Sequence, residues 1–224
     1  MKKIFIILAA YNEEEAIKKV INDVRHYADR VVVVDDGSTD RTGSLVSGKN
    51  TVLLRHFLNL GQGAALQTGF DYAVQNGADI VVTYDADGQF RASEIPQLTK
   101  PIIEGKADVV LGSRFLGKAV NISPLRLVTL KLAIIFTRIF SDLDLTDTHN
   151  GFRAMNRRAL QKIRITYNGM AHASEIIDEI KREKLKFVEV PVTVTYNQYT
   201  RKKSQSSFAA FRIFTDLLVK KLYY

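Results

Sequence analysis

The stretch at residues 80–89, IVVTYDADGQ, decides the fold. Its first four residues are apolar or β-branched, a pattern that predicts a strand buried on both faces. The pattern breaks abruptly at Asp85 and Asp87, and Gly88 then allows the chain to turn. Because open α/β folds bind ligands at the carboxyl ends of their parallel strands, we expect both aspartates to face a ligand.

Asp85 and Asp87 also have the chemistry of a metal site. Their two carboxylates and the amide oxygen of Gln89 are hard oxygen ligands that lie close together in the sequence. Such ligands suit Mg²⁺ or Mn²⁺ and leave coordination positions open for substrate phosphates. An acidic turn in which Asp85 caps the following helix is the alternative, and the spacing alone does not separate the two interpretations.

The composition indicates an ordinary globular protein of one domain, or one domain with a small appendage. The 224 residues are 46% apolar and 25% charged, which is enough to bury a substantial core. The absence of cysteine excludes disulfides and thiolate zinc sites and fits a cytoplasmic protein. The apolar run at residues 4–10 has the length of a strand rather than of a signal peptide. No segment has the roughly 20 uninterrupted apolar residues of a membrane-spanning helix.

Positive charge is concentrated in the last third of the chain. Residues 151–224 contain 15 bases and 6 acids, whereas residues 1–150 contain 17 bases and 18 acids. The net charge of +8 therefore comes from the C-terminal part. We expect that part to face an anionic partner, either membrane lipid or nucleic acid.

Strands and helices alternate through the first half of the chain, which predicts a mostly parallel, Rossmann-like α/β sheet with helices on both faces. Asn12 is the expected N-cap of the first helix. The predicted strands are residues 3–8, 30–34, 51–55, 80–83 and 107–111. The predicted helices are residues 13–28, a short one after residue 40, one from residue 61 to about 75, and one from residue 93.

The second half is less regular. Residues 127–140 are apolar except for two threonines and two bases, Lys131 and Arg138, so they predict either a core helix or a helix lying on a membrane. Further strands are expected at residues 151–155 and 186–196, with a helix at 174–183 between them. Residues 197–207 are polar and basic. Residues 208–222 are amphipathic, with apolar side chains at helical spacing, which is typical of a helix in the headgroup plane.

Three of the predicted strands end in polar signatures: AYNE at 10–13, DDGSTD at 35–40 and DADGQ at 85–89. Each is weak alone, but all three are expected at one crevice. Tyr11 can stack on a base, and Asp35 or Asp36 can accept hydrogen bonds from a base or ribose. Because acids repel phosphate, a diphosphate bound here requires a metal on Asp85 and Asp87.

With these motifs the sequence resembles the family 2 glycosyltransferases of the GT-A fold, in particular the polyprenyl-phosphate glycosyltransferases such as dolichol-phosphate mannosyltransferase. The resemblance covers residues 3–200, so a catalytic domain is expected at 1–200, followed by a basic loop and amphipathic helix at 201–224. Its markers are AYNEE at 10–14, VVDDGSTD at 33–40, NLGQGAA at 59–65, DADGQ at 85–89, GSRF at 112–115, DTHNGFRAMNR at 147–157 and VPVTVTY at 190–196.

The resemblance assigns roles to matching positions. It implies that the nucleotide pocket is lined by Ala9, Tyr11, Glu13 and Asp35 or Asp36. It implies that the metal and diphosphate are held by Asp85, Asp87 and Gln89, with Ala86 between the two aspartates. It implies catalytic roles for Asp87, Arg114 and Arg126, with Arg114 on phosphate charge, and basic contacts from Arg126 and Arg201.

Three departures from the family pattern stand out. Ala9 replaces the usual proline before Ala-Tyr-Asn-Glu, and Gln62 replaces the usual lysine of the Asn-x-Gly-Lys-Gly motif. Residues 196–206, YNQYTRKKSQS, replace the late Arg-x-x-Gly-x-Ser-Lys acceptor loop. The last departure concerns the lipid-phosphate contact and therefore the identity of the acceptor.

The implied enzyme is a metal-dependent, inverting glycosyltransferase that moves a sugar from a UDP- or GDP-linked donor to dolichyl or undecaprenyl phosphate. It would work as a peripheral protein on the inner face of the membrane, with or without a separate membrane-protein subunit, and without nucleic acid. The nearest alternative acts on a sugar hydroxyl of a lipid-linked or cell-wall glycan and needs a carboxylate base, for which Asp147 and Glu175 are the candidates. Two further alternatives are a nucleotidyltransferase, which the glutamates at residues 9–15 disfavour, and a non-catalytic nucleotide-sugar-binding subunit.

Overall fold

The computed structural model describes residues 2–141, 143–169 and 171–197. The predicted basic loop and amphipathic helix of residues 201–224, and Arg201 with them, lie outside the described residues. The strands are β1 (Ile4–Ala10), β2 (Arg30–Asp35), β3 (Thr51–Arg55), β4 (Ile80–Thr83), β5 (Val109–Val120), β6 (Arg153–Asn156) and β7 (Phe187–Thr195). The helices are α1 (Ile17–Val24), α2 (Thr42–Leu45), α3 (Gln62–Gln75), α4 (Ile95–Ile103), α5 (Pro124–Ser141), α6 (Arg157–Lys162) and α7 (His172–Arg182), with short 3₁₀ turns at Arg25–Tyr27 and Ala92–Glu94.

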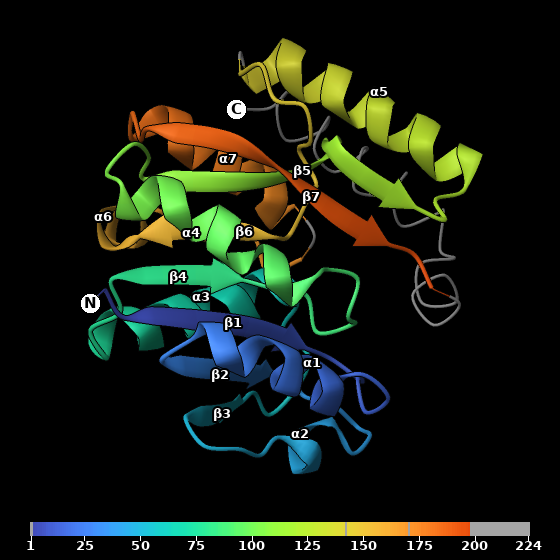
Figure 1. The fold of residues 1–224 in the computed structure, drawn as a ribbon. Helices are drawn as coiled ribbons and strands as arrows, with labels where there is room; N and C mark the ends of the chain where they lie inside the picture. The colour runs from blue at the N-terminus through green and yellow to red at the C-terminus, as the bar shows by residue number, and fades with distance from the viewer. Residues whose placement is uncertain (1, 142, 170, 198–224) are drawn as a thin grey trace.

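All these strands form one seven-stranded sheet in the order β3-β2-β1-β4-β6-β5-β7 (Figure 1). The pairs are parallel except where β6 lies antiparallel between β4 and β5. The predicted α/β class with a mostly parallel sheet is therefore confirmed. The insertion of β6 has one consequence for the site: it brings the segment before residue 153 to the carboxyl end of β4 and beside Gly112 of β5.

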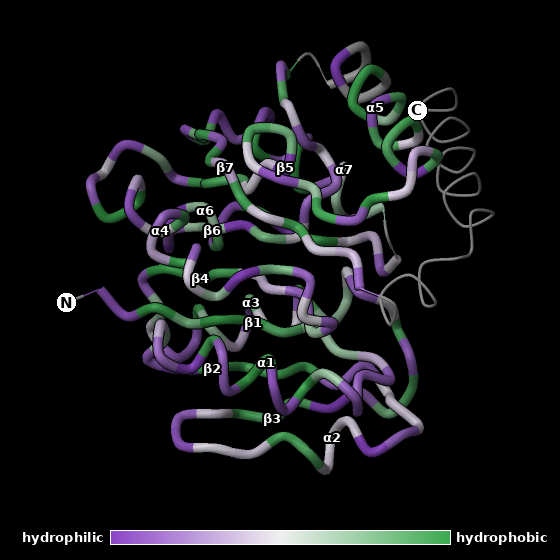
Figure 2. The backbone as a smooth tube through the Cα atoms, turned by 45° about the vertical axis from the view of Figure 1, so that its right-hand side comes forward, coloured by the Kyte–Doolittle hydropathy of each residue, from purple (hydrophilic) through white to green (hydrophobic). Residues whose placement is uncertain are grey.

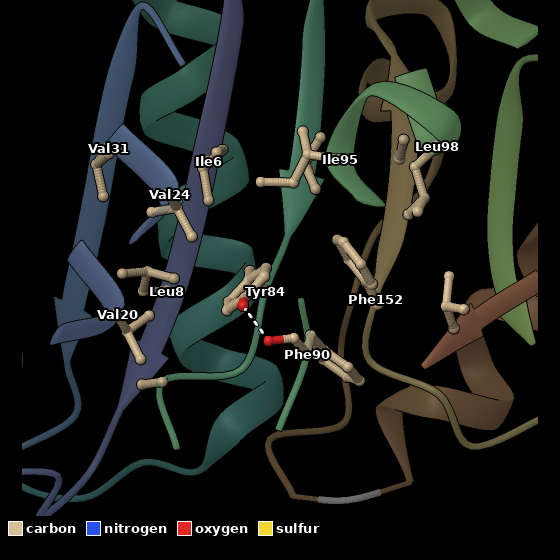
Figure 3. Close-up of a cluster of buried hydrophobic side chains, with 14 of the residues drawn as sticks. Ile6, Leu8, Val20, Val24, Val31, Tyr84, Phe90, Ile95, Leu98 and Phe152 are labelled. Atoms are coloured by element: carbon tan, nitrogen blue, oxygen red, sulfur yellow. Dashed lines mark hydrogen bonds between the residues drawn. The ribbon is translucent and has the colours of Figure 1, made fainter. Parts of the chain in front are cut away.

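Helices cover both faces of the sheet, because successive residues of a buried strand point to opposite sides. On one face of β1, Ile6 and Leu8 pack with residues of α1 and α4. On the other face, Phe5 and Ile7 pack with residues of α3, α6 and α7. Figure 3 shows the first of these layers, where Val20 and Val24 of α1 pack over β1 and β2. Hydrophobic residues dominate β1, β2 and β4 in the middle of the sheet (Figure 2).

The first helix begins four residues later than predicted, at Ile17, and Asn12 is not its N-cap. Asn12 adopts a left-handed backbone with φ of 53°, and its side-chain oxygen accepts a hydrogen bond from the Thr39 amide at 2.9 Å. The Glu13 amide donates to Thr42 Oγ1 at 2.7 Å. The N-cap prediction was wrong because the segment after β2 binds both the side chain of Asn12, through Thr39, and the amide of Glu13, through Thr42.

The helix α5 has an exposed apolar face, although Ile134 is buried. Its apolar residues Leu125, Val128, Leu132 and Ile135 recur at helical spacing and are 54–68% exposed. In Figure 1 the helix lies outside the sheet, beyond β5 and β7. None of the helices in the described parts of the chain combines the length and the apolar character that crossing a bilayer requires.

Candidate active site

The polar signatures after β1, β2 and β4 meet at one edge, because these strands are parallel neighbours. The first two signatures are bonded to each other. The amide of Asn12 donates to Ser38 Oγ at 3.0 Å, and the amide of Glu14 donates to Asp40 Oδ2 at 3.1 Å. These hydrogen bonds hold the loops after β1 and β2 together at this edge of the sheet.

The residues predicted to line the nucleotide pocket lie at the carboxyl ends of β1 and β2 or in the loops that follow them. Ala9 is near the end of β1, opposite Val34 of β2. Tyr11 follows the strand and is 40% exposed, so its ring is accessible to a base. Glu13 is buried, and its negative charge is close enough to raise the pKa of Asp85.

Asp35 and Asp36 are both buried, but they differ in what they hold. Asp36 accepts hydrogen bonds from the amides of Leu60 and Gly61, at 3.0 and 2.8 Å. The His56 Nδ1 atom lies 2.7 Å from the same carboxylate. Asp36 thus fixes the loop that leads into α3.

Asp35 accepts the amide of Ser38 on one oxygen at 2.9 Å. Its other oxygen, Oδ2, lies 3.2 Å from Arg55 Nε but accepts no hydrogen bond from the described residues. Of the two aspartates, Asp35 is thus the one with a carboxylate oxygen that accepts no hydrogen bond from the described residues, but this oxygen is buried beside Gly43 and Arg55. A direct contact of either with a nucleotide stays a prediction.

The aspartate loop after β4 is held at both ends by aromatic packing (Figure 3). Tyr84 precedes the loop, is buried, and donates its hydroxyl to the carbonyl of Phe90 at 2.6 Å. The rings of Tyr84, Phe90 and Phe152 pack against one another with centroids 4.9–5.5 Å apart. In addition, the amide of Thr195 in β7 donates to the carbonyl of Gln89 at 2.9 Å. Residues 85–89 are consequently presented on a rigid frame.

The electrostatics of this loop fit a divalent cation. Burial raises the pKa of Asp85 to about 7, with the negative charge of Asp87 as the next contribution, because both disfavour the ionised carboxylate. Gln89 is close by and donates its side-chain amide to Asp87 Oδ2 at 2.5 Å. Among the described residues no three histidine, cysteine, aspartate or glutamate side chains gather as a metal cluster. A metal held by Asp85, Asp87 and Gln89 would therefore rely on ligands from the substrate as well.

The residues that pack against Asp85 from the start of β6 were not predicted from the sequence. The carbonyl of Gly151 accepts the hydroxyl of Thr83 at 2.6 Å, which ties the segment before β6 to the end of β4. Arg153 then lies opposite Thr83 in the sheet, fully buried, and its charge lowers the pKa of Asp85 against the effect of burial. A charged residue inside an otherwise apolar strand sequence, FRAM, was the available signal.

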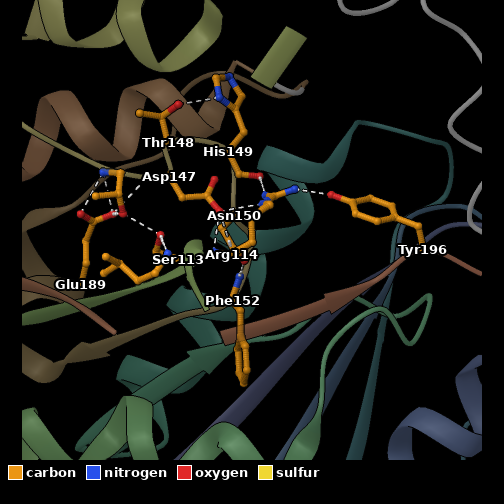
Figure 4. A network of polar contacts seen from close by, with 11 residues as sticks. Ser113, Arg114, Asp147, Thr148, His149, Asn150, Phe152, Glu189 and Tyr196 are labelled. Atoms are coloured by element: carbon orange, nitrogen blue, oxygen red, sulfur yellow. Dashed lines mark hydrogen bonds and ion pairs between the residues drawn. The ribbon is translucent and has the colours of Figure 1, made fainter. Parts of the chain in front are cut away.

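Arg114 lies in a buried network rather than on the surface (Figure 4). Its Nε donates to Asp147 Oδ2 at 2.6 Å, and Nη2 donates to the carbonyl of His149 at 3.0 Å. Asp147 is positioned in turn by Glu189 of β7, which accepts the amides of Thr146 and Asp147 at 2.9–3.1 Å. A phosphate contact from Arg114, predicted from the resemblance, would have to compete with these bonds.

Arg126 lies in the first turn of α5, about halfway between buried and exposed. Its guanidinium carbon is 4.8 Å from the centre of the Tyr196 ring. This cation–π contact places Arg126 beside the network of Arg114, since the Tyr196 hydroxyl is also bonded to Arg114. The structure thus brings Arg114 and Arg126 together, separated by one tyrosine.

Two histidines lie near the same network. Burial, with a contribution from the charge of Arg153, lowers the pKa of both His149 and His172 to about 4. His172 is close to Gly169, with Nδ1 2.9 Å from that carbonyl oxygen, so Nδ1 carries the proton. At neutral pH both rings are uncharged and can donate or accept hydrogen bonds without adding charge.

A family model described as "Glycosyl transferase family 2" matches residues 5–164. The chain belongs to this family. It is 32% identical to the UDP-N-acetylglucosamine–dolichyl-phosphate N-acetylglucosaminyltransferase of Methanococcus voltae, over 99% of this chain and 97% of that protein. It is 30% identical to the polyprenol monophosphomannose synthase of Mycolicibacterium smegmatis, over 92% of this chain and 82% of the relative.

This family 2 glycosyltransferase also has the GT-A fold. A solved structure of glucosyl-3-phosphoglycerate synthase from Mycobacterium tuberculosis, in complex with Mn²⁺, UDP-glucose and phosphoglyceric acid, matches it with a TM-score of 0.72. The match covers 96% of this chain and 79% of that chain at 19% identity, so it shows the fold alone. Family membership establishes that the protein is a glycosyltransferase enzyme, as the motifs predicted.

Proposed function

We propose that this enzyme is a divalent-metal-dependent, inverting glycosyltransferase that moves a sugar from a UDP- or GDP-linked donor to a polyprenyl phosphate. The printed names of the two relatives above, a dolichyl-phosphate and a polyprenol-phosphate glycosyltransferase, support this acceptor class. The catalytic domain would comprise residues 1–200, with residues 201–224 as an appended basic segment.

The observation that carries the choice of acceptor is the state of the two candidate bases. A sugar hydroxyl must lose a proton to a base as it attacks, whereas a phosphate monoester is already ionised. Both oxygens of Glu175 are occupied by the amides of Thr166 and Tyr167, at 2.9–3.0 Å. Asp147 is buried, and its Oδ2 forms an ion pair with Arg114; its Oδ1 accepts no hydrogen bond from the described residues but is shielded from solvent, so it is not exposed to a substrate hydroxyl. Neither carboxylate is presented as a base, which favours a phosphate acceptor.

On the donor side, Asp85, Asp87 and Gln89 would hold Mg²⁺ or Mn²⁺. When bound, the metal neutralises charge on the diphosphate of the leaving nucleotide. Tyr11 would stack on the base, and Asp35 would accept a hydrogen bond from the base or ribose. Ala9, Glu13 and Ala86 would shape the pocket around them. Asp36 would act by holding the loop before α3.

On the acceptor side, Arg126 is the accessible cation and Arg114 the buried one. Arg126 would orient the acceptor phosphate by a charge-assisted contact, and orientation is the main requirement for a nucleophile that is already ionised. Arg201 would add a second contact. Arg114 would contribute positive potential from within the network.

A polyprenyl acceptor stays in the bilayer, so the enzyme would bind the inner membrane face as a peripheral protein. The exposed stripe of Leu125, Val128, Leu132 and Ile135 on α5 supports this, because it is apolar and recurs at helical spacing. The bases of residues 201–221 would add electrostatic attraction to anionic lipid. A separate membrane subunit would then be unnecessary for acceptor access.

A matrix of donors and acceptors tests the proposal. Full-length protein is incubated with UDP- and GDP-sugars, Mg²⁺ or Mn²⁺, and a short polyprenyl phosphate, with the same polyprenol lacking phosphate as the matched control. We expect transfer to the phosphate only, with inverted anomeric configuration in the product by NMR and no product in excess chelator. Transfer to glycan hydroxyls instead, abolished by Asp147→Asn, would favour the glycan-acceptor enzyme.

A further inference from the structure

Tyr196 joins two cationic side chains that are far apart in the sequence. It follows the last residue of β7 and is 2% exposed. Its hydroxyl accepts a hydrogen bond from Arg114 Nη1 at 2.5 Å (Figure 4). The face of its ring carries the guanidinium of Arg126, 4.8 Å from the ring centre.

The hydroxyl side of Tyr196 is fixed by the rest of the network. Arg114 is 6% exposed, and its Nε and Nη2 atoms donate to Asp147 and to the carbonyl of His149. Asp147 is fixed in turn by Glu189 from β7, the strand that also leads into Tyr196. The hydroxyl of Tyr196 is therefore held by a guanidinium that is itself fixed, and the Tyr196 amide donates to the carbonyl of Val120 in β5 at 3.0 Å.

On its ring side, Tyr196 contacts the first turn of α5. Arg126 is in the first turn of the helix and stacks on the ring. Near the other end, Arg138 donates to the carbonyl of Leu145 at 3.3 Å and forms an ion pair with Asp144 at 2.8 Å. The outer face of α5 between them is exposed, so the first turn is held by the contact with Tyr196 and by Ser123, whose hydroxyl accepts the amide of Arg126 at 3.3 Å.

We propose that Tyr196 is a positioning residue, which presents Arg126 to the anionic group of the acceptor. An unrestrained arginine loses rotamer freedom when it binds a phosphate, whereas one already stacked on a fixed ring loses less. The ring supplies the restraint on Arg126, and the hydroxyl fixes the ring. That the anionic group belongs to a polyprenyl phosphate rests on the function proposed above. That Tyr196 restrains Arg126 and the first turn of α5 does not depend on it.

Steady-state kinetics of three variants test the role in the acceptor site. Tyr196→Leu removes ring and hydroxyl, Tyr196→Phe keeps the ring face, and Tyr72→Phe is the matched control. Tyr72 accepts a bond from Arg30 Nη1 at 2.9 Å, with that guanidinium 5.9 Å from its ring, at the amino end of β2. We expect Tyr196→Leu to raise the KM for polyprenyl phosphate about tenfold, with the donor KM changed less than about twofold.

The variants also separate positioning from a purely structural role. Tyr196→Phe is expected to raise the acceptor KM by no more than about threefold, and Tyr72→Phe not at all. Equal losses for donor and acceptor in Tyr196→Leu would mean that Tyr196 only supports the fold. A Phe variant as impaired as the Leu variant would overturn the role of the ring face.

Hydrogen exchange measures the restraint without any assumption about substrate. In the full chain, amides of residues 125–130 should exchange faster in Tyr196→Leu than in wild type or Tyr72→Phe, while β1 and β4 stay protected. Unchanged exchange there would overturn the inference even if the enzyme uses polyprenyl phosphate. If wild type transfers nothing to polyprenyl phosphate, the proposed function fails, and faster exchange would still establish the restraint.

Discussion

Gly151 and Asp85 are packed so closely that a side chain on the glycine has no room: a Cβ at Gly151 would lie 2.6 Å from Asp85 Oδ1. The glycine precedes β6 and the aspartate follows β4, so the antiparallel pairing of these strands brings the two together. The clash would be with the end of a side chain rather than with backbone. An added methyl group should therefore move the carboxylate and leave the sheet in place.

Gly151→Ala is accordingly expected to weaken Mn²⁺ binding at least about tenfold while lowering the free energy of unfolding by less than about 1.5 kcal/mol. Titration calorimetry with Mn²⁺ and urea unfolding measure the two effects. Gly169→Ala is the matched control, because a Cβ there has nothing within 4 Å. Unchanged Mn²⁺ affinity in Gly151→Ala would show that Asp85 does not hold the metal.

Asp87→Asn tests the second proposed metal ligand. Loss of one carboxylate weakens the metal and removes stabilisation from the leaving diphosphate, so we expect at least about a hundredfold loss of kcat. Asp87 accepts the amide and the side chain of Gln89 within its own loop, and the exchange of a carboxylate for an amide of the same shape keeps an acceptor there, so the fold should survive. Asp178→Asn on the outer face of α7 is the control. Full activity of wild type in excess chelator would exclude the metal altogether.

His172 predicts a pH dependence of stability. Its pKa is about 4 in the folded protein, below the ordinary 6.5, so the unfolded chain binds the proton first as pH falls. The contribution of His172 to stability is therefore complete above pH 6.5 and is lost as pH falls toward 4. Between pH 7 and pH 5 this loss should be about 2 kcal/mol.

His172→Asn keeps a donor for the Gly169 carbonyl but cannot be protonated, so its stability should fall less between pH 7 and pH 5. Urea unfolding of metal-free protein at both pH values gives the comparison. Asp85 contributes with the opposite sign, because its pKa is raised, but it contributes equally to both proteins. Parallel pH profiles for variant and wild type would contradict the buried, neutral state of His172.

The frame of the site was predictable from the sequence, because it depends on local signals. A run of apolar residues ended by carboxylates identifies the end of a buried strand, and the alternation of strands and helices implies that such ends share an edge. These rules placed residues 10–13, 35–40 and 85–89 at one edge, and the structure has β2, β1 and β4 as parallel neighbours.

The interior of the site was not predictable, because its bonds join distant segments. Arg114 is paired with Asp147, and also with Tyr196, which is 82 residues away along the chain. No local pattern indicates that β6 enters the sheet antiparallel, yet that insertion brings Arg153 behind Asp85. The failed N-cap at Asn12 has the same origin, since the competing donor comes from Thr39.

The membrane contact can be tested on α5 and on the C-terminal segment separately. Replacing Leu125 and Leu132 with serine removes two exposed leucines from the stripe, which should cost about 2 kcal/mol, or about thirtyfold in partitioning to vesicles. The matched control replaces Leu53 and Leu60, which are also exposed but lie in and after β3 at the opposite edge of the sheet.

Co-sedimentation with vesicles containing anionic lipid measures the partitioning at low salt. A chain ending at Ser207 loses Arg212, Lys220 and Lys221, and each base near an anionic surface contributes about 1 kcal/mol, so its binding should also fall and become less sensitive to salt. The α5 variant should instead keep its salt dependence while binding weakly, because it retains every base. If both altered proteins bind vesicles as well as the full chain does, α5 and the C-terminal segment are not the membrane contact, and the enzyme must reach a polyprenyl acceptor by another surface.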